Sequence, residues 1–282
     1  MNFGINTFVY ASPLSTEDME TLVPKVKEMG FDWIECPIEG LDDMDYGRAS
    51  KIVEDYALGV SCCAAMGPDR DLVHPDPAIR ASGMDYITGC IDRCKVIGAT
   101  NLVGPIYSSV GRTWQMTDEE RARTTDLLVE NLTQLAAYAS DNGVVLCLEP
   151  LNRFETSFIN LASQAIEVAD RVDSPACKIM LDTFHMNIEE KSLGDAIRAV
   201  GDRLVHFHAC GSDRGTPGTG TIQWDDVAQG LKDSNYDGPV VIESFTPKVK
   251  SIARAAAIWR PLASSSDALA ADGVKFLKQL LA

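Results

Sequence analysis

The sequence lacks the features that mark several classes of protein. The 282-residue chain has no CxxC pair, no GxGxxG motif and no apolar run near the roughly 20 residues of a membrane span. Its first residues, MNFGINTFVY, have neither the basic nor the long apolar segment of a secretory signal. Basic residues number 25 against 41 acidic ones, and the net charge of −16 argues against nucleic-acid binding, which usually needs a basic surface. We therefore expect neither a membrane nor a nucleic acid as partner.

The cysteines show no pattern of a metal or disulfide framework. Most of the eight lie inside apolar stretches. We interpret them as buried, reduced thiols of a cytoplasmic protein. They are Cys36, Cys62, Cys63, Cys90, Cys94, Cys147, Cys177 and Cys210.

Eight short apolar runs alternate with longer amphipathic stretches. The intervals suit one strand, one helix and two loops, about 30 residues or more. The expected strand ends are Asn6, Cys36, Ala64, Gly104, Glu149, Asp182, His208 and Glu243. The pattern predicts a single (β/α)8 TIM barrel spanning residues 1–282. A doubly wound open sheet is the rival, but a dinucleotide-binding sheet would show GxGxxG after its first strand. GTPGTG at 215–220 lacks a phosphate-binding lysine and reads as a turn.

Helix signals fill the intervals between these runs. Residues 15–30 begin with Ser and Thr, followed by acidic residues, and end in Gly30. Residues 117–143 start with Thr117 and Glu120 at capping-box spacing. Residues 160–172 repeat the amphipathic pattern. PLASSSDALAADG is the loosest segment, and we expect the last helix to follow it in GVKFLKQLLA.

Four successive strands are expected to end on side chains that can bind metal. They are Glu149 in CLEP, Asp182 in IMLDTFH, His208 in HFHAC and Glu243 in VVIES. Active sites of such barrels lie at the C-terminal ends of the strands. Three carboxylates and one imidazole suit Mn²⁺, Mg²⁺ or Co²⁺ rather than structural zinc. A cation would also let Glu149 stay ionised at the end of an apolar strand.

Other interpretations of these residues remain open. Asp182 is also a possible N-cap for the helix that follows. His206 and His208 share one side of a strand, and His206 is expected to be a core or supporting histidine. Arg153 and Glu155 could form loop ion pairs.

Read together, EPLNRFE at 149–155, DTFHMNIEE at 182–190, HFHACGSDRGTPGTG at 206–220 and VVIESF at 240–245 resemble the ketose 3-epimerases. This group includes the D-tagatose, D-allulose (psicose) and L-ribulose 3-epimerases within the xylose isomerase-like TIM barrels. GPDRDL after the third strand and AIWRPLA near the C-terminus extend the likeness over nearly the whole chain.

The resemblance implies a metal-dependent enzyme that inverts C3 of a free ketose through a cis-enediolate. Its metal ligands fall on the same four residues, with Glu149 and Glu243 as the acid/base pair on opposite faces of the sugar. Its substrate-binding residues match Glu155, His185 and Arg214. It also implies Mn²⁺, with Co²⁺ or Mg²⁺ as alternatives, and a homodimer or homotetramer.

The pocket wall shows one departure from the family pattern. Many relatives carry an aromatic residue on the first strand where this chain has Asn6. We expect the wall to include Asn6, Phe8, Met66, Trp114 and Phe245. The loop around Trp114, with Gly111 as hinge, either forms a lid or covers a helix.

Three rival functions share this fold. A hydroxypyruvate-type isomerase or inosose dehydratase would use the same metal barrel, but Glu155, His185 and Arg214 favour the epimerase. A DNA-repair endonuclease needs more than four histidines and a basic groove. A non-catalytic sugar-binding barrel would not need two glutamates paired across a metal.

Overall fold

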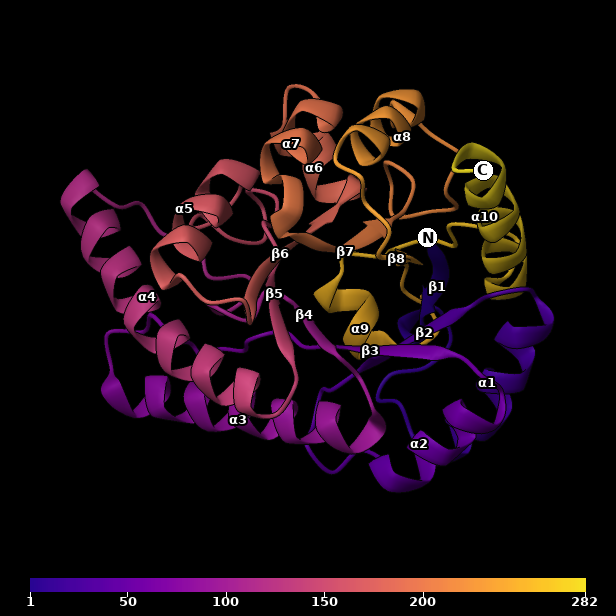
Figure 1. Ribbon diagram of the computed structural model, residues 1–282, viewed down its shortest axis with the longest axis horizontal. Helices are drawn as coiled ribbons and strands as arrows, with labels where there is room; N and C mark the ends of the chain where they lie inside the picture. The colour runs from indigo at the N-terminus through magenta and orange to yellow at the C-terminus, as the bar shows by residue number, and fades with distance from the viewer.

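The structure, a computed structural model, describes residues 1–282 and is a closed barrel of eight parallel strands. Neighbours in the barrel are neighbours in the chain, and β1 closes it by pairing with β8 (Figure 1). The strands are β1 Asn2–Asn6, β2 Trp33–Pro37, β3 Gly59–Cys63, β4 Asn101–Gly104, β5 Val145–Leu148, β6 Cys177–Asp182, β7 Leu204–Ala209 and β8 Pro239–Ile242. The predicted (β/α)8 fold is confirmed, and each strand ends within one residue of the expected position.

Helices surround the barrel and pack against its outer face, apart from α9, which lies over one end of it (Figure 1). They are α1 Thr16–Glu28, α2 Tyr46–Asp55, α3 Pro77–Ile97, α4 Asp118–Asp141, α5 Ala162–Val172, α6 Thr183–Glu189, α7 Leu193–Val200, α8 Trp224–Asp233, α9 Lys250–Ala255 and α10 Ser266–Leu280. Two short 3-10 turns lie at Thr7–Val9 and Gly201–Arg203. None of the helices is long and apolar enough to cross a bilayer.

The predicted helix starts are confirmed by their caps. Ser15 forms a capping box with Asp18 at the start of α1, and Thr117 forms one with Glu120 at the start of α4. Each box satisfies backbone N–H groups that have no partner within the helix.

The predicted start of the last helix was wrong. Helix α10 begins at Ser266, seven residues before Gly273, inside the segment predicted to be loose. Ser265 caps it by accepting from the Ala268 N–H, and Leu269 and Val274 pack into the core. The short helix after β8, α9, was not predicted from the sequence.

The apolar core has two parts. A cluster of 69 buried residues fills the layer in which strands meet helices. Cys63, Val103, Cys147 and Met180 form a separate small cluster. Strand pairing sets Met180 beside His206, so this cluster shares the barrel interior with polar side chains.

Strand register brings the polar side chains of the interior together. Asp182 of β6 pairs with His208 of β7. On the other side of the barrel, Glu35 pairs with Asn6 of β1 and with Ser61 of β3. Because paired residues in a sheet point to the same face, these sets become neighbours inside the barrel.

Gly104 at the end of β4 provides a test of local packing. Its φ is +121°, and an added Cβ would lie 2.4 Å from the Ala64 carbonyl oxygen. Gly98 has a φ of +87° but open space around it. We predict that Gly98→Ala costs about 1 kcal/mol of unfolding free energy from the left-handed backbone alone. Gly104→Ala should cost a further 1–3 kcal/mol or so from overpacking. Urea unfolding measures both, and equal losses would contradict the steric argument.

Candidate metal centre

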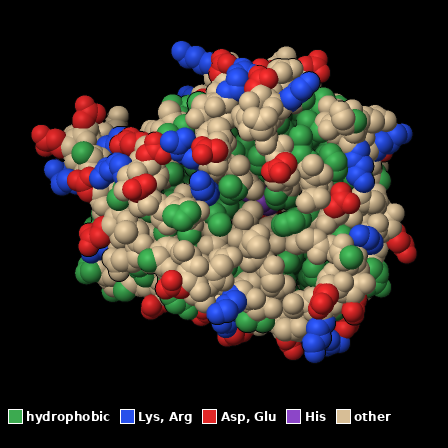
Figure 2. Space-filling model, in the orientation of Figure 1, with side chains coloured by type: hydrophobic (Ala, Val, Ile, Leu, Met, Phe, Trp, Pro, Cys, Tyr) green, Lys and Arg blue, Asp and Glu red, His purple; other side chains and the backbone are tan.

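A cavity of about 1140 Å³ lies at the end of the barrel where the strands terminate. Its wall contains Glu149, His208 and Glu243 from strand ends, together with residues 251–252 and 254–258 from α9 and the turn after it. Figure 2 shows a hollow on this face, with histidine atoms visible at its floor and apolar side chains around it. The position is the one at which barrels of this type carry out chemistry.

Four predicted ligands meet at the floor of this cavity. Glu149 follows β5, Asp182 ends β6, His208 lies near the end of β7 and Glu243 follows β8. One ligand atom from each residue lies within 4.8 Å of the others, and all four residues are buried. Glu149 Oε1, Asp182 Oδ2 and His208 Nδ1 have no hydrogen-bond partner. Buried polar atoms without partners are costly, so their convergence fits a divalent cation.

The electrostatics of the group also favour a cation. Burial, reinforced by nearby Glu243, raises the pKa of Glu149 well above its usual range. Burial likewise raises the pKa of Asp182, although His185 opposes the shift. For Glu243, burial is outweighed by His208 and Arg214, which hold its pKa below the usual value. A positive ion at this point would offset the cost of keeping all three carboxylates ionised.

The two carboxylate oxygens of Asp182 have different partners, and one of them faces the ring of His208. Asp182 Oδ1 accepts from the Phe184 N–H at 2.6 Å and caps α6, so the N-cap interpretation holds as well. Its Oδ2 faces His208 Nδ1 at 3.9 Å. His208 Nδ1 also lies 3.4 Å from Glu243 Oε1. Asp182 Oδ1 thus holds the first turn of α6, while Asp182 Oδ2 remains available as a metal ligand.

Arg214 connects the metal group to the cavity wall. It is buried, its backbone φ is +62°, and its Nη1 donates to Glu243 Oε2 at 2.7 Å. Its Nη2 donates to Glu155 Oε1 at 3.1 Å and lies 2.9 Å from His185 Nε2. A non-glycine residue at positive φ costs free energy, and such strain often accompanies a functional site. Glu155, His185 and Arg214 are therefore brought together beside the four ligands.

His185 is oriented by the loop after β5. The Asn152 N–H donates to His185 Nδ1 at 2.9 Å, and the Asn152 side chain donates to Glu155 Oε1. Burial, together with Arg214, lowers the pKa of His185 to about 4, so the ring is neutral at pH 7. Its Nε2 lies 3.6 Å from Glu149 Oε1. Asn152 was not singled out from the sequence, although it lies within the EPLNRFE motif.

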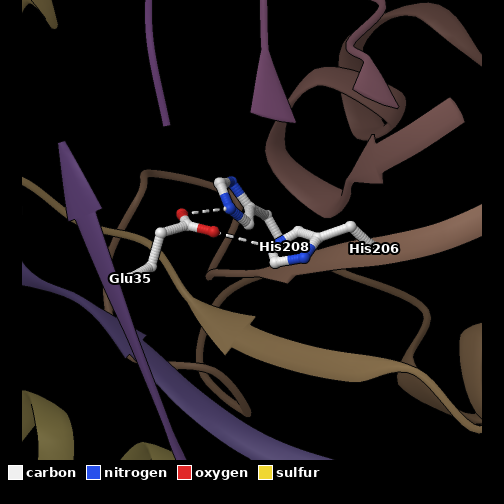
Figure 3. A group of neighbouring side chains, drawn as sticks. All are labelled: Glu35, His206 and His208. Atoms are coloured by element: carbon white, nitrogen blue, oxygen red, sulfur yellow. Dashed lines mark hydrogen bonds and ion pairs between the residues drawn. The ribbon is translucent and has the colours of Figure 1, made fainter. Parts of the chain in front are cut away.

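A second buried cluster was missed by the sequence analysis. Glu35 of β2 lies between His206 and His208, and each carboxylate oxygen faces one ring (Figure 3). Burial alone would raise the pKa of Glu35, but His208 and His206 outweigh it and hold that pKa well below the usual range. Glu35 carried the same signal as Glu149, a carboxylate within an apolar run. The prediction that His206 is a buried supporting histidine fits this placement.

The cavity wall differs from expectation at two positions. Phe8, Met66 and Phe245 line it, and the rings of Phe8 and Phe245 lie 5.3 Å apart. Asn6 does not line it, because its side chain turns into the barrel and donates to Glu35. Trp114 does not line it either, because its ring packs 6.0 Å from that of Phe158. The expectation that both belong to the wall was wrong.

The surrounding loops also have clear contacts. Val110 and Gly111 line the cavity, and the Gly111 N–H donates to the Glu155 carbonyl. Arg153 forms an ion pair with Glu189 at 2.9 Å, away from Glu155. GTPGTG forms turns, as expected.

The known proteins that this chain resembles agree with the interpretation of the site from its geometry. The family described as xylose isomerase-like TIM barrel matches residues 23–280. A probable ketose 3-epimerase of Synechocystis sp. is 32% identical, with 99% of this chain and 96% of the relative covered. A D-psicose 3-epimerase of Enterocloster bolteae is 34% identical, with 93% and 88% covered. The crystal structure of D-allulose 3-epimerase from Methylomonas sp. in complex with D-allulose has a TM-score of 0.92 at 29% identity, with 99% and 96% covered.

The four-residue group predicts a specific response to metal. At an Mn²⁺ concentration 100 times Kd, the wild-type protein should gain about 2.7 kcal/mol of stability over the EDTA-treated protein. Glu149→Gln should lose this gain, because a neutral amide replaces a carboxylate ligand. Glu155→Gln should keep it, because Glu155 lies outside the group. Thermal unfolding with and without Mn²⁺ measures the difference, and an unchanged gain in Glu149→Gln would contradict the assignment.

Proposed function

Because the chain belongs to the xylose isomerase-like TIM-barrel family and to its ketose 3-epimerases, which are epimerases acting on carbohydrates, we propose that it inverts C3 of free ketoses. The proposed pairs are D-allulose/D-fructose, D-tagatose/D-sorbose and L-ribulose/L-xylulose. The observation that carries the proposal is the pair of buried glutamates beside convergent, unpartnered ligand atoms. The cavity above them has room for a monosaccharide.

The proposed cofactor is a divalent cation held by Glu149, Asp182, His208 and Glu243, with Mn²⁺ preferred and Co²⁺ or Mg²⁺ as alternatives. The ligand set of oxygens and one imidazole suits these ions. Such a cation would supply Lewis acidity that stabilises the negative charge developing on the ketose oxygens.

Glu149 and Glu243 are the proposed proton-transfer pair. The C3 hydrogen lies next to the ketose carbonyl, so its removal gives an enediolate. Glu149 follows β5 and Glu243 follows β8, two strands that are not adjacent in the barrel. This separation supports an approach of the two carboxylates from different sides of the sugar, as inversion would require. One removes the proton from one face of the sugar, and the other returns a proton to the opposite face.

Arg214, His185 and Glu155 are the proposed substrate contacts. Arg214 offers N–H donors, and His185 is a neutral ring that Asn152 holds at Nδ1. The same Asn152 donation leaves the His185 proton on Nε2, close to the Arg214 Nη2. Two N–H groups at 2.9 Å would both be satisfied by a shared sugar oxygen. Glu155 would orient the sugar or the Arg214 side chain.

The state of the cysteines bears on where in the cell the protein is found. All eight cysteines are free and buried, which supports a reducing compartment such as the cytoplasm. The homodimer or homotetramer remains a prediction, and the mass of the protein in solution would test it.

A related sugar isomerase or an inosose dehydratase is the second candidate, since it would use the same metal group. The Glu155–His185–Arg214 network beside the ligands favours the epimerase. The position at which solvent hydrogen enters the substrate separates the two reactions.

Deuterium exchange tests the proposed reaction. Incubation of the Mn²⁺-loaded protein in D2O with D-fructose, D-allulose, D-tagatose and L-ribulose should place deuterium at C3, as NMR would show. Deuterium only at C1 would indicate an aldose–ketose isomerase instead. Glu149→Gln and Glu243→Gln should each abolish inversion at C3, because each residue is both a proposed metal ligand and a proton-transfer group. Inversion retained in either variant would reject the two-base scheme.

Arg214→Ala tests the substrate contacts separately. Loss of a charge-assisted hydrogen bond worth about 1.5–3 kcal/mol should raise KM roughly 10- to 100-fold. Arg153→Ala is a matched control, because Arg153 pairs with Glu189 outside the network. Steady-state kinetics and Mn²⁺ titration measure both properties. Lost Mn²⁺ binding in Arg214→Ala would show that this residue supports the metal group instead.

A further inference from the structure

Glu35 is a fully buried carboxylate that the proposed reaction does not use. It lies in the middle of β2, and its exposed fraction is 0%. An ionised carboxylate in such a place is costly unless its oxygens have partners. Its partners therefore indicate why it is there.

Each oxygen of Glu35 has two polar contacts. Oε1 accepts from Asn6 Nδ2 at 2.9 Å and lies 2.7 Å from His208 Nε2. Oε2 accepts from Ser61 Oγ at 2.8 Å and lies 2.8 Å from His206 Nε2. A carboxylate has about four acceptor sites. Three hydrogen bonds occupy three of them, and the ring of His206 lies against the same carboxylate.

These contacts argue against a second cation at Glu35, His206 and His208. The three residues could hold a metal by proximity alone. However, His208 Nε2 is already hydrogen-bonded to Glu35 Oε1, and Asn6 and Ser61 donate to the same carboxylate. The cluster is a hydrogen-bonded hub, in which Glu35 is the acceptor.

The hub determines which nitrogen of His208 carries its proton. An ionised carboxylate only accepts hydrogen bonds, so His208 Nε2 must carry the hydrogen that faces Glu35. In the neutral ring that a metal ligand requires, the lone pair is then on Nδ1, the atom that lies 3.4 Å from Glu243 and 3.9 Å from Asp182. A ligating histidine must present an unprotonated nitrogen. Figure 3 shows the Glu35 carboxylate facing the rings of both His206 and His208.

We propose that Glu35 is the positioning residue of the metal centre: it fixes the ring and tautomer of His208, while Asn6, Ser61 and His206 fix Glu35. The inference rests on the proposed metal site and adds a residue outside the four ligands. A carboxylate behind a ligating histidine orients the ring and raises its basicity, and its loss typically weakens metal binding 10- to 100-fold. Asn6 thereby has a role here other than lining the pocket.

Mn²⁺ titration of Glu35→Gln tests the proposal by calorimetry. The amide keeps the size of the side chain but has no charge and one acceptor oxygen in place of two, so the acceptor that holds the His208 ring is weakened. We expect the Mn²⁺ Kd to rise 10- to 100-fold. Asp71→Asn is the matched control: Asp71 is equally buried, pairs with Arg112 at 2.9 Å and does not contact a ligand. It should lose stability and keep the wild-type Kd.

A second measurement needs no variant. Long-range ¹H–¹⁵N correlation spectra of the wild-type protein loaded with diamagnetic Mg²⁺ should show the His208 proton on Nε2. A proton on Nδ1 would overturn the proposal, as would a Glu35→Gln Kd within threefold of wild type. Failure of the wild-type protein to bind either metal would overturn the metal centre of the proposed function, and this inference with it.

Discussion

Three carboxylates that converge in a buried place are the constraint to which the rest of this site responds. At a separation near 4 Å and an effective dielectric constant near 20, two like charges repel by about 4 kcal/mol. Arg214 supplies positive charge from the loop after β7 and reaches Glu243 directly. This one charge cannot pair with every oxygen, since Glu149 Oε1 and Asp182 Oδ2 stay without partners. A cation would complete the balance, which is why metal and fold are expected to stabilise each other.

The barrel makes this convergence possible through register. Parallel strands that close in sequence order end at one edge, so residues far apart in the chain become neighbours there. The same register places a polar layer beneath the metal group, with Glu35 paired to Asn6 and Ser61. The floor of the cavity therefore lies on this layer of hydrogen-bonded side chains within the barrel. Through Glu35 the layer holds the ring of His208, so it belongs to the site even though it does not reach the cavity.

The sequence allowed the strand ends to be predicted because an apolar run followed by a charged residue is a local pattern. It did not allow side-chain direction to be predicted, which depends on register between distant strands. Asn6 could equally have faced the cavity, and only the pairing of β1 with β2 turns it toward Glu35. Trp114 was misplaced for a similar reason, since its partner Phe158 comes from another loop. Helix α9 was missed because its six residues are too few to show a period.

Helix α9 and the turn after it have a consequence for how such enzymes diversify. This segment follows the last strand and forms one wall of the cavity, yet it supplies none of the four ligands and none of the Glu155–His185–Arg214 network. The residues proposed to move a proton and this part of the wall are thus encoded in separate stretches of the chain. Substitutions in α9 and the turn after it would therefore reshape the cavity without replacing a proposed ligand, which would let one barrel evolve several substrate preferences.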